Sequence, residues 1–271
     1  MHIDSYFCLS KFDLRDADYV IYGIPYDATQ SFKPGSRFAP TAIREASWNI
    51  EEFSHYFNYD LSEVRLHDAG NVNCDGSFLE IAKRVEEFTS KIDCTPIALG
   101  GEHSVSVAAA RKFRNATFLV LDAHFDLRDE FDGDKFNHAC TTRRIYESGM
   151  NVVIAGVRSG PAEEVEFVKK NGISFFYAWD FDADKIAREI EGDVYLSIDM
   201  DVFDPAYAPG VSTPEPFGIS PIQFLKLLEK ISSSIVAFDI VEVVPDACRI
   251  TSALAAKLIF ETIAAIEKTK I

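Results

Sequence analysis

The sequence predicts an α/β protein built on a parallel sheet. Eight short apolar segments, rich in β-branched and aromatic residues, alternate with amphipathic segments of helical period. Strands that alternate with helices form βαβ units, whose strands run parallel. The strand candidates cover residues 17–24, 63–70, 95–101, 117–124, 151–157, 173–179, 193–199 and 234–243. Eight such strands fit either a closed barrel or an open doubly wound sheet, and periodicity does not separate the two.

Five amphipathic segments supply the expected helices. They cover residues 40–53, 76–92, 161–172, 221–232 and 251–268. The chain has 271 residues, which is close to the size of roughly 250–300 residues beyond which one core usually divides into domains. Because no Pro-, Gly- or Ser-rich linker and no run of like charge interrupts the pattern, we expect a single domain over residues 1–271.

The composition argues against several classes of partner and location. The formal net charge is −16, whereas a phosphate backbone requires clustered lysine and arginine, so no nucleic-acid partner is expected. No segment approaches the roughly 20 apolar residues of a membrane span, and the first residues show no signal-peptide pattern. The five cysteines form no CxxC pair, which fits reduced thiols in a cytoplasmic protein.

Acidic and imidazole side chains follow the fourth predicted strand in a regular pattern. Asp122, His124 and Asp126 come directly after the apolar residues 117–121. In an extended segment, alternate side chains point to the same side, so these three are expected to converge. Because parallel α/β folds carry their sites at the carboxyl ends of the strands, the pattern indicates a functional site there.

Three other predicted strands end in side chains of the same kind: Glu102 and His103, Asp199 and Asp201, and Asp239 and Glu242. Packed carboxylates repel one another or take up protons unless cations neutralise them. Two divalent ions would balance four aspartates, and a carboxylate-rich shell with a few imidazoles suits Mn²⁺ better than Zn²⁺. Paired ions of this kind commonly lie about 3.5–4 Å apart and generate a hydroxide nucleophile. We therefore predict two Mn²⁺ ions and, if these groups share one site, a preference for a cationic substrate.

A single aspartate at a strand end also has an ordinary explanation. Such residues often cap the following helix or close a turn. This interpretation fits Asp68, Asp204 and Asp239, and His67 is expected to be structural or at the surface. The combination of motifs at several strand ends is what favours a metal site over turn residues.

The segments GGEHS, DAHFD and SIDMDVFDPAYAPG resemble the metal-binding motifs of the ureohydrolase family, which includes arginases, agmatinases and formimidoylglutamases. In the first motif, Glu102 stands where the family usually has aspartate. The resemblance extends to PGSRFAPTAIREAS, FNHACTTRRI and DIVEVVP, so it covers nearly the whole chain. It implies the arginase-like fold, a single-domain three-layer αβα architecture with an open sheet of eight mainly parallel strands.

The resemblance also implies roles for matched residues. One metal ion would be bound by His103, Asp122, Asp126 and Asp199, and the other by His124, Asp122, Asp199 and Asp201. The implied catalytic residues are His138 as the proton shuttle, Glu242 as the carboxylate that pairs with the guanidinium, and Asp126 as a hydrogen-bond partner of the nucleophile. The ordinary alternatives are a loop histidine for His138 and a strand-end ion pair for Glu242.

The implied reaction is hydrolysis of a small cationic guanidino compound, with urea released after attack by a metal-bridging hydroxide. The segments DAHFDLRDEFDGDKFNHACTTRRI and STPEP look like the agmatinase form, which predicts agmatine as substrate and putrescine, a polyamine precursor, as product. Asp129 and Glu130 are candidates for the far amine, with solvated loop acids as the alternative. Val211, Ser212 and Phe217 depart from the family pattern and leave the specificity open. The resemblance also implies a homo-oligomer, a trimer or hexamer.

Other functions remain open at the level of the sequence. Arginine, guanidinobutyrate and formimidoylglutamate carry a carboxylate and would need a cationic side chain to bind it. The candidates in this chain are Arg128, Arg143, Arg144 and Arg158. A generic metallohydrolase would be active without Glu242. A catalytically silent metal-binding paralogue would usually lack a ligand or His138, whereas this chain has them all.

Overall fold

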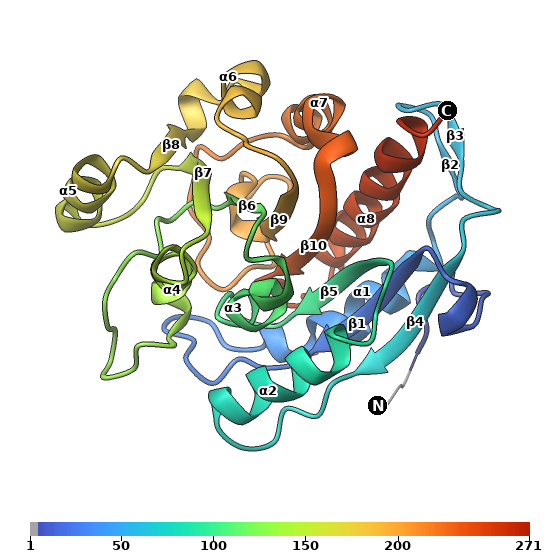
Figure 1. Cartoon of the computed structure of the whole chain (residues 1–271), viewed down its shortest axis with the longest axis horizontal. Coiled ribbons are helices and arrows are strands. Elements are labelled where there is room, and N and C mark those ends of the chain that lie inside the picture. Colours follow the sequence, from blue (N-terminus) through green and yellow to red (C-terminus); the bar gives the residue numbers. More distant parts are fainter. Residues whose placement is uncertain (1–4) are drawn as a thin grey trace.

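Eight strands form one open sheet at the centre of the computed structural model, which describes residues 5–271 (Figure 1). Every neighbouring pair in this sheet is parallel. In spatial order the strands are β4 (Leu66–Asn71), β1 (Tyr19–Ile24), β5 (Thr95–Gly100), β10 (Ile235–Val241), β9 (Val194–Asp199), β6 (Thr117–Leu121), β7 (Asn151–Val157) and β8 (Ser174–Tyr177). Because β4 and β8 lie at opposite ends of this order and do not pair with each other, the sheet is not a barrel, and the prediction of eight parallel strands is confirmed.

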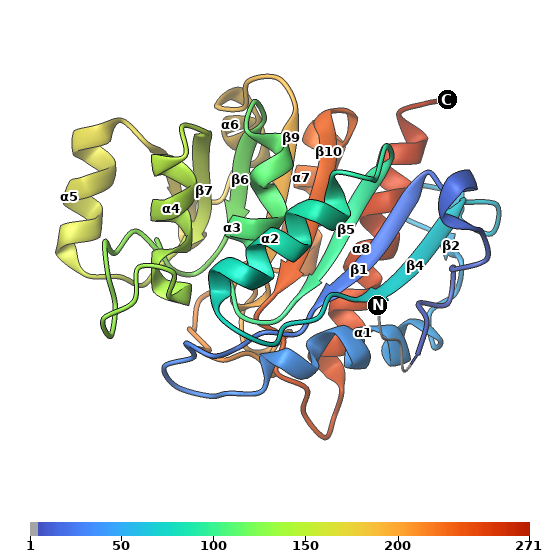
Figure 2. The same ribbon diagram turned by 60° about the horizontal axis from the view of Figure 1, so that its bottom comes forward.

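Helices cover both faces of the sheet (Figure 2). One face carries α1 (Ala39–Ser47), α6 (Ala183–Arg188), α7 (Pro221–Ile231) and α8 (Ile250–Lys268). The other carries α2 (Phe78–Thr89), α3 (Val105–Ala109), α4 (Thr141–Glu147) and α5 (Ala162–Asn171). The buried apolar side chains accordingly divide into two clusters, one on each side of the sheet. The predicted three-layer αβα architecture is therefore confirmed.

Local sequence signals account for the helix ends. Ser77 and Glu80 form a reciprocal capping box at the start of α2, and Ser220 and Gln223 form another at the start of α7. Helix α5 ends at Gly172, whose φ of 65° is the left-handed conformation that glycine adopts without a steric penalty. These signals define the ends of the longer helices that the sequence predicts.

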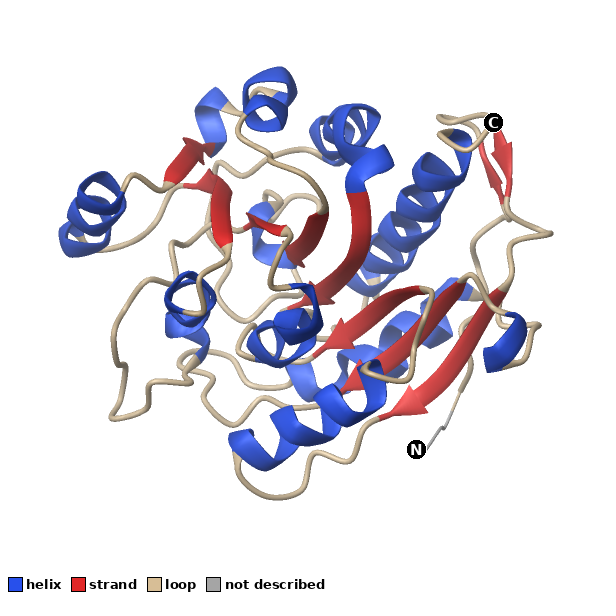
Figure 3. Ribbon diagram, viewed as in Figure 1, coloured by secondary structure: helices blue, strands red, loops and turns tan. Residues whose placement is uncertain are grey.

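The short elements are those that the sequence does not predict. Helices α3, α4 and α6 have five to seven residues, and β2 (Phe53–Ser54) pairs with β3 (Tyr59–Asp60) in a separate antiparallel hairpin (Figure 3). An amphipathic period needs a window of about 11 residues or more to be recognised, so such short helices leave no clear pattern.

Asp68 lies inside the protein rather than in a turn or at a helix cap. The guanidinium of Arg44 donates to both carboxylate oxygens of Asp68, at 2.7 and 2.8 Å, and the Phe7 N–H donates to the same carboxylate at 2.8 Å. Both charged residues are buried between α1 and β4. The interpretation of Asp68 as a turn residue is therefore wrong, and this ion pair joins a helix to the edge strand.

We expect Asp68→Ala to lower the free energy of unfolding by about 3–5 kcal/mol, because it leaves the buried Arg44 guanidinium without its counter-charge. The matched control is Asp18→Ala, which breaks the half-exposed Asp18–Arg65 pair and is expected to cost less than about 1 kcal/mol. Urea denaturation of both variants measures the difference. Equal, small losses would show that the buried pair does not stabilise the fold.

The central strands carry the predicted site residues. β5, β10, β9 and β6 are adjacent in the sheet, and their carboxyl ends lie beside one another. The predicted site residues stand at these carboxyl ends. Glu102 and His103 follow β5, Glu242 follows β10, and residues 122–126 follow β6. Asp199 is the last residue of β9, and Asp201 comes two residues later. Within residues 5–271, no helix has both the length and the apolar character that a membrane crossing requires.

Candidate metal centre

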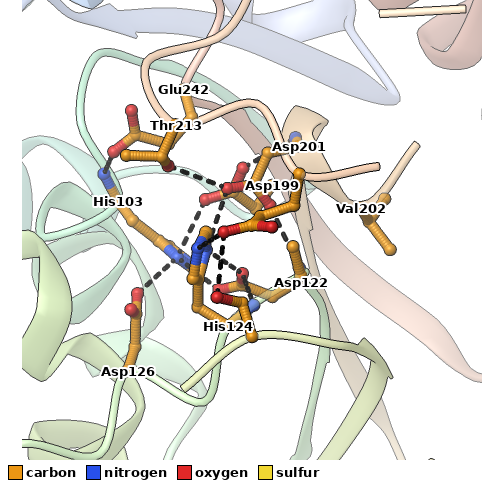
Figure 4. Close-up of polar contacts among 12 residues, drawn as sticks. His103, Asp122, His124, Asp126, Asp199, Asp201, Val202, Thr213 and Glu242 are labelled. Atoms are coloured by element: carbon orange, nitrogen blue, oxygen red, sulfur yellow. Dashed lines mark hydrogen bonds and ion pairs between the residues drawn. The ribbon is translucent and has the colours of Figure 1, made fainter. Parts of the chain in front are cut away.

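The six predicted metal ligands lie together at this edge of the sheet (Figure 4). The Nδ1 atom of His103 is 3.1 Å from Asp122 Oδ2, 3.0 Å from Asp126 Oδ2 and 3.2 Å from Asp199 Oδ2. On the other side, His124 Nδ1 is 3.0 Å from Asp201 Oδ2 and 3.4 Å from Asp122 Oδ1. The side chains therefore face one another rather than solvent.

These contacts define two adjoining groups of ligand atoms. His103, Asp122 and Asp199 form one group and Asp122, His124 and Asp201 form the other, with the ligand atoms of each within 4.8 Å of one another. Asp122 belongs to both, so two ions held there would share its carboxylate. His103 Nδ1 and Asp122 Oδ2 are buried and face each other at 3.1 Å, and within residues 5–271 no polar group outside the centre satisfies either atom. Their donor set of imidazole nitrogen and carboxylate oxygen fits divalent cations such as Mn²⁺.

The backbone brings these residues together in a way that strand alternation does not explain. β6 ends at Leu121, and Asp122 to Asp126 belong to the loop that follows it. Asp126 adopts a left-handed φ of 52°, which is uncommon for a residue with a side chain and recurs at functional sites. Asp201 lies in a short 3-10 helix (Met200–Val202), not in a strand. Strand alternation is therefore not the physical reason for the clustering.

The electrostatics of the centre show why it needs cations. Burial, followed by the charges of Asp201 and Asp122, raises the pKa of Asp199 well above its usual value. Burial and the charge of Asp122 raise the pKa of Asp126 to about 7. Burial opposes the charged form of His103, but hydrogen bonds to three carboxylates outweigh it and raise the pKa of His103. Without cations the cluster must hold protons, which divalent ions would replace.

A buried chain of hydrogen bonds fixes the ring of His103. The Ser197 hydroxyl donates to Asp239 Oδ1 at 2.7 Å, because a carboxylate can only accept. The Ser197 oxygen, 3.2 Å from His103 Nε2, is then left to accept the proton of that nitrogen. When a divalent cation replaces the proton on His103 Nδ1, this nitrogen would face the cation with its lone pair. Asp239 also accepts from Tyr195 within β9 and β10, so its interpretation as a turn residue is wrong, whereas Asp204 does close a turn.

We expect Ser197→Ala to weaken the ion bound at His103 about 10- to 100-fold, because the imidazole loses the group that orients it. Tyr195→Phe is the matched control, since the Tyr195 hydroxyl donates to the same Asp239 but does not contact His103. Competition with a chelator measures both metal affinities. An unchanged affinity in Ser197→Ala would contradict this role.

Glu242 lies directly after β10 in a constrained backbone conformation. Its φ is 65°, and its N–H donates to Gly101 O at 2.8 Å. Its carboxylate accepts the His103 N–H at 2.7 Å and the Gln30 side-chain amide at 2.6 Å, and burial raises the pKa of Glu242. Among the described residues, no cationic side chain lies within hydrogen-bonding distance of the Glu242 carboxylate. The interpretation of Glu242 as one partner of a strand-end ion pair is therefore wrong.

His138 lies beside the centre, at the start of a 3-10 helix (His138–Cys140). The Thr29 hydroxyl donates to Glu102 Oε1, so His138 Nδ1, 3.3 Å from the Thr29 oxygen, must supply the proton of that contact. His138 Nε2, 3.1 Å from Ser31 Oγ, is then the basic nitrogen. Burial lowers the pKa of His138, which keeps the ring neutral near pH 7 and able to accept a proton.

A cavity of about 340 Å³ opens over the centre, and its walls include His124, Asp126, Arg128, His138, Glu164 and Thr213. The Thr213 hydroxyl donates to Asp201 Oδ2 at 3.2 Å, and Glu215 Oε1 is 3.9 Å from His124 Nε2. Asp129 and Glu130, which were predicted to bind the second amine of the substrate, do not line this cavity. They line a separate depression on the surface. Val211 and Ser212 are buried, whereas Phe217 is exposed.

The four arginines proposed as readers of an anionic substrate have different roles. Arg158 donates to backbone carbonyls of residues 156, 201–203, 215 and 216, and so holds the loop that carries Asp201 and Glu215. Arg143 pairs with Glu147, and Arg144 pairs with Asp129 and Glu147. Arg128, stacked over the Phe131 ring at 4.8 Å, is the one of the four that lines the cavity.

Several residues of the site escaped the sequence analysis. Thr29, Gln30 and Ser31, in the loop after β1, contact Glu102, Glu242 and His138, respectively. Ser197 and Arg158 support the ligands from inside the fold. Thr29, Gln30, Ser31 and Arg158 lie outside the metal motifs, and Ser197, although it begins the motif SIDMD, is recognised as a partner of His103 only from tertiary structure. Glu102, which replaces the usual aspartate, accepts from Thr29 and Ser104 and belongs to neither ligand group.

A buried pair of ligand groups at the carboxyl edge of an eight-stranded parallel sheet defines a binuclear metallohydrolase. The model of the arginase family matches residues 17–265, and the chain belongs to this family. Its relatives include an agmatinase of Pyrococcus horikoshii, 40% identical over 266 residues and 94% of each chain. An N(1)-aminopropylagmatine ureohydrolase of Thermococcus kodakarensis is 38% identical over 267 residues, 93% of this chain and 92% of the relative.

The solved structures agree with this assignment. The agmatine ureohydrolase of Thermoplasma volcanium superposes with a TM-score of 0.93 at 36% identity, covering 100% of this chain and 97% of the other. Proclavaminate amidino hydrolase from Streptomyces clavuligerus superposes with a TM-score of 0.88 at 29% identity, covering 99% and 98%. The predicted ureohydrolase family and fold are therefore confirmed.

Proposed function

We propose that the protein hydrolyses agmatine to urea and butane-1,4-diamine (putrescine), with two Mn²⁺ ions held by His103, Asp122, His124, Asp126, Asp199 and Asp201. The observation that carries the proposal is the pair of adjoining ligand groups that share Asp122 beside the buried carboxylate of Glu242. Relatives named agmatinase at 35–40% identity support agmatine as the substrate.

The residues around the ions have separable roles. Two bound divalent cations would supply a hydroxide nucleophile near neutral pH and polarise the reacting group. Glu242 orients the planar guanidinium through charge-assisted hydrogen bonds, which place its central carbon over the centre. Asp126 lies on the cavity wall within reach of His103 and accepts a hydrogen bond from the nucleophile. His138 is neutral, so its basic Nε2 can first accept the proton that the nucleophile releases on attack and then donate that proton to the leaving amine.

The choice of substrate rests on charge and on the far end of the cavity. Agmatine has a guanidinium and a second cation but no carboxylate, which suits a cavity whose wall includes the acidic side chain of Glu164. N(1)-aminopropylagmatine is the second candidate, because a relative with 38% identity carries that activity in its name. To bind arginine or guanidinobutyrate, the protein would have to pair the substrate carboxylate with Arg128, the one of the four candidate arginines that lines the cavity.

The test is urea release by the Mn²⁺-loaded protein from agmatine, N(1)-aminopropylagmatine, arginine and guanidinobutyrate. We expect the highest kcat/KM for agmatine and the lowest values for the two carboxylate-bearing compounds. A higher kcat/KM for arginine or guanidinobutyrate would overturn the substrate assignment and would indicate that Arg128 binds the carboxylate.

Metal identity, assembly and location belong to the same proposal. Mn²⁺ is preferred because the shell has four carboxylates and two imidazoles and no cysteine. A trimeric or hexameric homo-oligomer and a cytoplasmic location rest on the family resemblance. Size-exclusion chromatography with light scattering tests the assembly.

A further inference from the structure

The loop between β1 and α1 reaches the centre although it carries none of the predicted ligands. It is anchored at two points. The Thr29 N–H and hydroxyl donate to the two oxygens of Glu102, both at 2.7 Å. The Gly35 N–H donates to the buried Asp27 carboxylate at 2.9 Å. Gln30 lies between these anchors, so its side chain is presented by a fixed backbone.

The side chain of Gln30 has one possible orientation toward Glu242. Its terminal amide is 2.6 Å from Glu242 Oε2, and an ionised carboxylate only accepts, so the nitrogen Nε2 must face it. The other oxygen of Glu242 accepts the His103 N–H at 2.7 Å. Each carboxylate oxygen offers about two lone-pair sites, so Glu242, which Ser212 also approaches, keeps acceptor capacity for a substrate. Gln30 and His103 thus hold Glu242 without saturating it.

The opposite end of the same amide has no partner. Gln30 Oε1 is buried, and no donor among residues 5–271 reaches it. A buried carbonyl without a donor is costly, and it is common where a ligand completes the bond. A monosubstituted guanidinium carries five N–H donors in one plane, more than one carboxylate can accept.

We propose that Gln30 is a guanidinium-binding residue: its nitrogen holds the Glu242 carboxylate, and its carbonyl oxygen accepts an N–H of the bound guanidinium. The inference rests on the proposed function, because it assumes a guanidino substrate at Glu242. Glu242 and Gln30 would then accept from one planar cation together, an arrangement that the non-planar ammonium groups of a diamine do not match.

The test is Gln30→Met, which keeps the length of the side chain and removes both amide atoms. We expect KM for agmatine to rise about tenfold or more, the loss that follows removal of a hydrogen bond to a charged group. The inhibition constant of butane-1,4-diamine is expected to stay unchanged, because this product has no guanidinium. Ser31→Ala, on the same loop but in contact with His138, is the matched control and is expected to lower kcat rather than to raise KM.

A KM within about twofold of the wild type, or an equal rise in the inhibition constant of the diamine, overturns the inference. Metal content and melting temperature show whether Gln30→Met is folded. If it is not, Gln30→Asn replaces it, since the shorter amide keeps the chemistry but withdraws it from Glu242, and the same split is expected. If the wild type releases no urea from agmatine, the proposed function fails. Thermal-shift titrations then test the inference separately: Gln30→Met must weaken the binding of agmatine but not the binding of butane-1,4-diamine.

Discussion

Replacing Asp122 by alanine is expected to remove both metal ions and to lower urea release at least about 10³-fold. Asp122 is the carboxylate common to both ligand groups, 3.1 Å from His103 Nδ1 and 3.4 Å from His124 Nδ1. Its loss leaves each ion one ligand short and removes the bridge between them. Metal ions contribute several kcal/mol to such reactions, and each 1.4 kcal/mol is tenfold in rate. Metal analysis by mass spectrometry and a urea assay measure the two effects.

The control for this prediction is Asp129→Ala, in the same chain segment but at the surface, where Asp129 pairs with Arg144. It is expected to keep both ions. Adding Mn²⁺ is expected to raise the melting temperature of the wild type but not of Asp122→Ala, because only the wild type binds the ions in its folded state. Retention of two ions by Asp122→Ala would contradict the assignment.

Glu242→Gln is expected to lower kcat/KM for agmatine roughly 30- to 4,000-fold, which corresponds to about 2–5 kcal/mol for a buried, hydrogen-bonded charge pair that loses one partner. The substitution preserves shape but leaves a neutral amide opposite the guanidinium. Both metal ions should remain, because Glu242 contacts the backbone N–H of His103 and not its ring. Steady-state kinetics and metal analysis of the same sample measure this result.

A kcat/KM close to that of the wild type in Glu242→Gln would show that the guanidinium binds elsewhere. It would favour a general metallohydrolase that needs no carboxylate for substrate recognition. Loss of metal from Glu242→Gln would instead show that the Glu242 carboxylate supports the ions.

The fold was largely predictable because its central strands are buried on both faces. Residues 117–121 and 194–198 are mostly apolar and are followed by aspartate, which is typical of strands covered on both faces. Periodicity left the choice between barrel and open sheet unresolved, because that choice depends on whether β4 and β8 pair with each other. Helices such as α3, with five residues, were not predictable, because tertiary packing rather than a local period stabilises them.

The candidate site was predictable where its residues follow strands, and not where they reach it through space. His103, Asp122 and Asp199 stand at the ends of adjacent strands, so their motifs mark the site. Gln30 contacts Glu242, which is 212 positions away in the chain, and Ser197 contacts His103, which is 94 positions away. No local sequence pattern encodes such contacts.

The same limit explains the wrong interpretations. Asp68 and Asp239 look like strand-end turn residues, but their partners, Arg44 and Tyr195, lie on other elements. Arg158 looks like a free cation, yet backbone carbonyls of a distant loop surround it. Sequence shows which polar residues a chain contains, whereas the partner that satisfies each one is decided by the fold.

The most direct test of the central claim is urea release from agmatine as metal-free protein is titrated with Mn²⁺. We predict no turnover without metal and full turnover when two ions are bound per chain, because both ligand groups of the centre must be filled. Full activity with one ion per chain, or no urea with two ions bound, would contradict it.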